Sequence, residues 1–184
     1  MKQLAFVLVA LVVLVAMALV DEGFGQTGPA ALTTSSAAPN GVTIPDGYRA
    51  WQLITVAREE GKLDDLRAIL GNDIAVNAAR AGKEAYPDGA ILARLAWSYE
   101  PLAESAQAFG QPQSHVVGHP KNGLQLMVKH SSRYASTGGW GFAQFDGGKP
   151  SPQAVQNSCF ACHSVVKNRD FVFNRYATTG EQRP

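Results

Sequence analysis

Both cysteines of the chain lie in one short motif, Cys159-Phe160-Ala161-Cys162-His163, close to the C-terminus. This CxxCH spacing is the attachment motif of c-type haem. Residues three and four apart share one face of a helical turn, so two sulfurs can reach the two vinyl groups of a haem while the imidazole points at its iron. The motif predicts one covalent haem c, with Cys159 and Cys162 as its thioethers and His163 as axial ligand of the iron.

Two other uses of the cysteine pair are less favoured. A thioredoxin-like redox pair would end a strand in a βαβ unit, which the sequence pattern does not indicate, and a structural disulfide rarely closes so short a loop. A zinc site would need two further ligands from His115, His119 and His130, and none of these stands at metal-ligand spacing with a second cysteine pair.

The first 25 residues have the layout of an export signal. Lys2 precedes an unbroken apolar run from Leu4 to Val20, and small residues follow. We expect cleavage after Gly25 and a periplasmic protein. An uncleaved N-terminal anchor is the alternative, because the 17 apolar residues fall just short of the ~20 that span a bilayer.

The remaining chain is predicted to form one domain. A chain of 184 residues with 46% hydrophobic and 17% charged residues is typical of a globular protein. Residues 26–40 are rich in small and polar residues without charge, so we expect a disordered linker there, a haem domain over 41–177 and a polar tail over 178–184. The formal net charge of +1 lacks the basic excess of a nucleic-acid-binding protein.

The pattern of apolar and turn-forming residues predicts an α+β fold, mainly β, with an antiparallel sheet and short helices. Strands are expected over residues 51–56, 90–99, 124–129 and 140–145. Asn72 is placed to cap a short helix that ends at Arg80, and another short helix is expected to start at Ser151-Pro152. Between Leu63 and Leu70 the apolar residues fall at helical spacing, so periodicity alone predicts a helix there.

The strand over residues 90–99 gives Arg94 two options. The odd positions from Ile91 to Tyr99 form a continuous apolar face, which we expect to be the core side. Arg94 occupies an even position, so its side chain must face either solvent or the haem.

The sequence does not indicate a sixth ligand of the iron. Met127 is the only methionine after residue 25, and it lies mid-strand, where packing in the core is favoured over iron ligation. The remaining histidines, His115, His119 and His130, are expected at the surface or in hydrogen bonds.

Four longer blocks resemble the cytochrome P-460 and cytochrome c′-beta family of periplasmic haem proteins. The blocks are Gly47 to Trp51, Pro87-Asp88-Gly89, Tyr134 to Phe142, and Asp170 to Phe173 after the CxxCH motif. The resemblance implies a mainly antiparallel β fold, a homodimer, and a five-coordinate haem whose open face binds small nitrogen species. It also implies that residues 66–70 form a strand, against the helix that periodicity predicts.

The resemblance gives Arg94 a candidate role in the distal haem pocket. Hydroxylamine-oxidising members attach a lysine to the haem ring six residues past the Asp of the Asp-Gly turn, and counting from Asp88 gives Arg94. A guanidinium stays protonated and is a poor nucleophile, so this cross-link is not expected. Lys83 or another lysine would substitute only under a different register. In this respect the chain resembles the c′-beta branch.

Three functions are compatible with these features. The leading hypothesis is an exported five-coordinate haem protein that binds nitric oxide or a related small nitrogen ligand. The alternatives are a hydroxylamine or nitric oxide oxidoreductase, served by a periplasmic electron-transfer protein, and a six-coordinate electron-transfer cytochrome ligated by Met127 or a histidine.

Overall fold

The computed structural model describes residues 36–178. The expected export signal, residues 26–35 of the expected linker and residues 179–184 of the expected tail lie outside the described residues. Within residues 36–178, no helix is long and apolar enough to cross a membrane.

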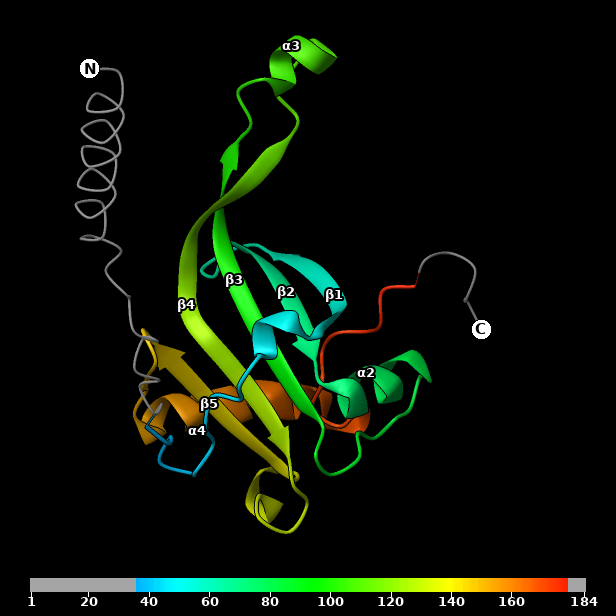
Figure 1. The fold of residues 1–184 in the computed structure, drawn as a ribbon, viewed down its shortest axis with the longest axis vertical. Helices are drawn as coiled ribbons and strands as arrows, with labels where there is room; N and C mark the ends of the chain where they lie inside the picture. The colour runs from blue at the N-terminus through cyan, green and yellow to red at the C-terminus, as the bar shows by residue number, and fades with distance from the viewer. Residues whose placement is uncertain (1–35, 179–184) are drawn as a thin grey trace, which may run out of the picture. The chain divides into compact units, whose positions relative to one another are not determined.

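Six antiparallel strands form one sheet, and their order in the sheet is their order in the sequence (Figure 1). The strands are β1 Gln52–Glu59, β2 Asp65–Gly71, β3 Ile91–Pro101, β4 His115–Lys129, β5 Trp140–Asp146 and β6 Lys149–Pro150. The helices are α2 Asp73–Arg80, α3 Ser105–Phe109 and α4 Gln153–His163, with 3₁₀ turns at Tyr48–Ala50, Ala135–Thr137 and Ser164–Arg169. The predicted α+β, mainly β fold with an antiparallel sheet is confirmed.

Segment 65–71 is the strand β2, so the helix that periodicity predicts is wrong and the strand implied by the family resemblance is confirmed. β2 pairs with β1 on one side and with β3 on the other. Ile69 is buried in one apolar cluster of the protein and Leu70 packs against a second. A strand that is covered on both faces has apolar residues at consecutive positions, and such a run also satisfies helical spacing.

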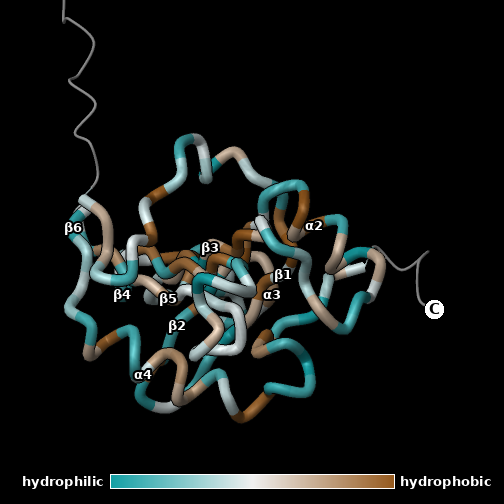
Figure 2. Tube along the Cα trace, turned by 90° about the horizontal axis from the view of Figure 1, so that it is seen from below, coloured by the Kyte–Doolittle hydropathy of each residue, from teal (hydrophilic) through white to brown (hydrophobic). Residues whose placement is uncertain are grey.

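The sheet carries an apolar cluster on each face, where the sequence indicated a single core side. The odd residues of β3, such as Ala93, pack with the N-terminal segment that contains Ala38 and Val42. The even residue Leu92 is also buried, in a cluster with Ile54, Ile69, Phe142 and residues of α2. Hydrophobic residues accordingly line the central strands, β3 among them (Figure 2). Arg94 shares the face of Leu92 and therefore does not point to solvent.

The packed domain begins before the expected boundary at Gly41. Ala38, within the expected linker, is buried, and the Asn40 side chain donates a hydrogen bond of 2.8 Å to the carbonyl of Phe142. A segment without charge was expected to stay disordered, but small residues can fill shallow space over a sheet.

Asn72 caps α2 as predicted. Its side-chain oxygen accepts a hydrogen bond of 3.0 Å from the Ala75 N–H and another of 3.1 Å from the Ile91 N–H. One side chain therefore satisfies the helix N-terminus and ties it to the start of β3.

The hairpin of β3 and β4 extends well beyond its neighbours, and its tip carries α3 (Figure 1). Pairing of β3 with β2 ends at Trp97, and pairing of β4 with β5 begins at Leu124. We call residues 98–120 the arm. The sequence did not predict it, because the expected strands ended at residue 99 and began again at residue 124.

Candidate functional site

Helix α4 brings the three residues of the cysteine motif to one cavity. The helix ends at His163, and Cys159, Cys162 and His163 all line a cavity of about 490 Å³. Small-molecule and cofactor sites commonly measure roughly 300–1,000 Å³. Both thiols are free, so the structure has no disulfide between them. Burial, followed by the neighbouring Cys162, raises the pKa of the Cys159 thiol.

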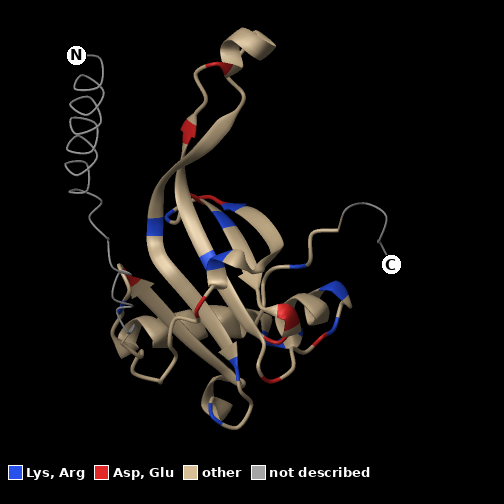
Figure 3. Ribbon diagram, viewed as in Figure 1, with Lys and Arg blue, Asp and Glu red and all other residues tan. Residues whose placement is uncertain are grey.

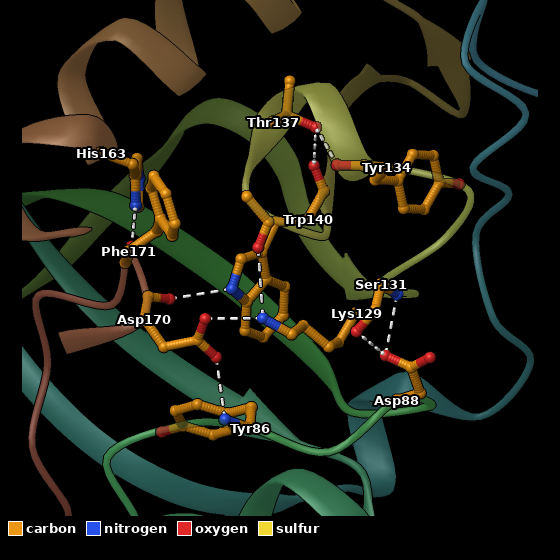
Figure 4. A network of polar contacts seen from close by, with 11 residues as sticks. Tyr86, Asp88, Lys129, Ser131, Tyr134, Thr137, Trp140, His163, Asp170 and Phe171 are labelled. Atoms are coloured by element: carbon orange, nitrogen blue, oxygen red, sulfur yellow. Dashed lines mark hydrogen bonds and ion pairs between the residues drawn. The ribbon is translucent and has the colours of Figure 1, made fainter. Parts of the chain in front are cut away.

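A backbone carbonyl orients the imidazole of His163. Its Nδ1 lies 2.7 Å from the carbonyl oxygen of Phe171, and a carbonyl only accepts, so Nδ1 carries the proton and the Nε2 lone pair is free for a metal (Figure 4). Burial lowers the pKa of His163, and the hydrogen bond to Phe171 opposes this. The ring centres of Phe142 and Phe173 each lie 5.1 Å from the centre of the imidazole. The hydrogen bond and the two aromatic rings therefore hold the imidazole in one orientation.

A buried network holds the segment that carries this acceptor. The Asp170 carboxylate lies 2.6 Å from Lys129 Nζ and accepts a hydrogen bond of 2.8 Å from the Tyr86 N–H. The Asp170 carbonyl accepts one of 2.8 Å from Trp140 Nε1. Figure 4 shows that Tyr86, Lys129 and Trp140 converge on Asp170, which precedes the Phe171 partner of His163.

Arg94 lies in the same cavity as the cysteine motif. Its Nη2 is 2.5 Å from the Asp65 carboxylate and its Nη1 donates a hydrogen bond of 2.8 Å to Gln125. Burial lowers the pKa of Arg94, as does the positive charge of Arg67, while Asp65 raises it. A guanidinium remains charged in proteins, so the cavity contains a fixed positive charge.

Sequence reasoning missed Asp65 and Gln125, which hold Arg94, and Arg67, which shares the Asp65 carboxylate with it. Asp65 has no exposed surface and also pairs with Arg67 Nε at 2.9 Å. Arg67 lines the cavity too, and its Nη2 is buried without a hydrogen-bond partner. The available signal was alternation: once β2 is a strand, Asp65 and Arg67 face the same side as Ile69.

The candidates for a sixth ligand differ in whether they line the cavity. Met127 lines the cavity and also packs against the apolar cluster around Leu92 and Phe142, its neighbours across the sheet. His115, His119 and His130 are not among the residues that line the cavity. Over residues 36–178, no group of three or more His, Cys, Asp or Glu is arranged so that it could hold a metal ion.

The donor set suits a haem c. Two free thiols and an imidazole share a cavity whose walls include apolar side chains such as Ile54, Leu92 and Phe142. The largely buried guanidiniums of Arg67 and Arg94 also line it, and both pair with Asp65. Structural zinc would need more thiolate or imidazole ligands than this cavity offers.

Comparison with known proteins agrees with this chemistry. A family model described as Cytochrome P460 matches residues 45–174. A search of curated proteins found no match to the chain. The matched segment is more than half of the chain and includes the sheet, Arg94 and the complete cysteine motif. The chain therefore belongs to the cytochrome P460 family of haem-binding cytochromes.

Proposed function

We propose that this protein is an exported mono-haem cytochrome that binds a small nitrogenous ligand such as nitric oxide. In this proposal the haem is attached through Cys159 and Cys162, and His163 is its only protein ligand. The observation that carries the proposal is the shared cavity, which joins the cysteine motif to Arg94 and has no second histidine among its lining residues. When bound, the haem supplies an iron coordination position and one-electron redox chemistry.

The protein side of this function is orientation, water exclusion and charge. The hydrogen bond from Nδ1 of His163 holds the imidazole for axial ligation. Apolar residues such as Leu92 and Phe142 limit access of water to the cavity. Asp65 and Gln125 hold the Arg94 guanidinium in place through hydrogen bonds. The remaining N–H groups of Arg94 can donate to an anionic or hydrogen-bond-accepting ligand.

Two other functions remain as alternatives with specific signatures. Oxidation of hydroxylamine or nitric oxide would pass electrons to a periplasmic electron-transfer protein, and Arg94 at the cross-linking position argues against the lysine-linked haem of hydroxylamine-oxidising members. Electron transfer by a six-coordinate haem would require the side-chain sulfur of Met127, which lines the cavity, to ligate the iron.

Optical spectroscopy of the purified holoprotein tests the proposal. Acid-acetone extraction should leave the haem on the polypeptide, and Cys159→Ser with Cys162→Ser should abolish this retention. The ferrous protein should be high-spin and should bind nitric oxide stoichiometrically. A low-spin ferrous spectrum would support the electron-transfer alternative, and a strongly red-shifted ferrous band would show a cross-linked haem.

Cell fractionation tests the location. We expect the mature protein in the osmotic-shock fluid, with Gln26 at its N-terminus by mass spectrometry. Recovery in the membrane fraction with residues 1–25 intact would support the uncleaved anchor instead.

We also propose a homodimer that forms through the arm. Phe109 and Val117 on the arm are each 58% exposed. The arm contains Glu100 and Glu104 but no lysine or arginine (Figure 3). The outer edges of its two strands have no partner among the described strands, and open strand edges readily pair with another chain.

Sedimentation at several concentrations measures this association. Phe109→Ser with Val117→Ser should give a monomer, whereas Val165→Ser should leave the dimer unchanged, because Val165 is an apolar residue outside the arm that is 77% exposed. An unchanged dimer in the double variant would exclude the arm as the interface.

A further inference from the structure

The hydrogen-bond acceptor of His163 sits on an unfavourable stretch of backbone. Phe171 has φ of 64° and the preceding Asp170 has φ of 50°. Residues with side chains, and bulky ones above all, rarely adopt this left-handed conformation, so other contacts must hold it. The contacts around Asp170 and Phe171 thus set the orientation of the Phe171 carbonyl.

Those surroundings constrain Asp170 at every polar side-chain and carbonyl atom. One carboxylate oxygen meets Lys129 Nζ at 2.6 Å and the other accepts from the Tyr86 N–H. The Asp170 carbonyl accepts from Trp140 Nε1. The Phe171 ring lies against Gly138, where a Cβ atom would overlap it. Contacts from β4, β5 and the loop before β3 therefore fix the two residues.

Lys129 is the charged element of this arrangement. It closes β4, its side chain is buried, and its Nζ lies 5.0 Å from the centre of the Trp140 ring. A buried ammonium is costly to keep without a partner, so Lys129 and Asp170 hold one another in place. The pair lies 41 residues apart in sequence and joins the sheet to the segment that follows the cysteine motif.

We propose that the Lys129–Asp170 ion pair is a positioning element that sets the hydrogen bond from His163 to Phe171 and, through it, the reduction potential of the haem. This inference rests on axial ligation by His163, as in the proposed function. Neither Lys129 nor Asp170 is a catalytic residue, because they act through the Phe171 carbonyl.

The direction of the effect follows from the chemistry of imidazole ligands. A short hydrogen bond from Nδ1 to a fixed acceptor makes the ring a stronger donor, which favours the ferric state. A Phe171 carbonyl that is free to rotate weakens the bond, so loss of the ion pair should raise the midpoint potential.

The test is the paired substitution Lys129→Met with Asp170→Asn. It removes one positive and one negative charge, so the net charge is unchanged, and asparagine tolerates the left-handed conformation at position 170. Losses of outer-shell contacts change metal-site equilibria by about tenfold or more. A tenfold change in the ferric-to-ferrous ratio corresponds to about 59 mV for a one-electron couple. We expect an upward shift of this size and a lower iron–histidine stretching frequency in the resonance Raman spectrum.

Asp88→Asn is the matched control. Asp88 lies near Tyr86 in sequence and accepts hydrogen bonds from Ser131, but it makes no contact with Asp170 (Figure 4). This control should leave the Raman band at the wild-type value. Because it removes a single negative charge, its potential measures the effect of that charge alone.

A folded, haem-loaded double variant with wild-type potential and Raman band would overturn the inference. If the double variant does not fold, Lys129→Gln with Asp170→Asn is measured instead, because it also removes both charges but keeps polar side chains at the two positions. Its potential and Raman band then decide. Failure of the proposed function would appear in the wild-type protein, as absent haem or a second protein ligand. Failure of this inference would appear only when the potential and Raman band of the double variant are compared with those of the wild-type protein.

Discussion

Asp65 provides the sharpest stability test of the cavity. Its carboxylate has no exposed surface, and its two oxygens are taken by Arg94 at 2.5 Å and by Arg67 at 2.9 Å. Asp65→Ala removes the acceptor for both guanidiniums, which are themselves largely buried. The variant should therefore lose much of the free energy of unfolding, although the substituted residue is small.

The magnitude follows from the contacts. A hydrogen bond to a charged group contributes roughly 1.5–3 kcal/mol, so loss of two would cost about 3–6 kcal/mol. Arg67 keeps Glu59 and Arg94 keeps Gln125. We therefore expect a loss of about 3–5 kcal/mol, the usual range when one partner of a buried ion pair is removed. For a domain of this size, a Tm decrease of about 2–4 °C per kcal/mol gives roughly 6–20 °C.

Urea unfolding of the holoprotein, followed by far-ultraviolet circular dichroism, measures this loss. Glu60→Ala is the control, since Glu60 pairs with Arg58 at the surface and its side chain is 77% exposed. Exposed pairs contribute little, so the control should unfold at the wild-type urea concentration. If Asp65→Ala were no less stable than the control, the buried carboxylate would not hold the two guanidiniums.

Three further substitutions test other parts of the site. Arg94→Leu should weaken azide binding to the ferric protein roughly tenfold and lower the midpoint potential, because a fixed charge and its donors are lost; unchanged values would exclude a role in ligand binding. Met127→Leu roughly conserves volume, so it should cost under about 1.5 kcal/mol and leave the spin state unchanged; conversion from low to high spin would identify Met127 as the sixth ligand. Gly138→Ala should destabilise the protein to urea more than Gly47→Ala, because both positions have positive φ but only Gly138 abuts the Phe171 ring; equal losses would show that the ring moves aside freely.

Local signals predicted much of the fold. The cap at Asn72, the turns that bound the strands and the start of the helix after Ser151-Pro152 depend on side chains within a few positions of one another. Such interactions are visible in sequence because they do not depend on how the chain packs elsewhere.

Longer-range features escaped this approach. Periodicity predicted a helix in place of β2 because a strand that is covered on both faces need not alternate between polar and apolar residues. Only the pairing of β2 with β1 and β3 shows that this segment is a strand. The arm was missed because its polar and apolar residues follow no clear alternation, and mutual pairing of β3 with β4 holds it.

The sequence by itself determined the chemistry that the protein can perform. The CxxCH spacing places two thiols and an imidazole on one helical face, and the sequence has an arginine, Arg94, where the family resemblance implies a cross-linking lysine in other members. Tertiary structure decided what surrounds those groups. Asp65, Arg94 and Gln125 come together from three strands, and Lys129 meets Asp170 across 41 residues of sequence. These contacts depend on strand register and on burial, which arise only when distant segments pair and exclude water.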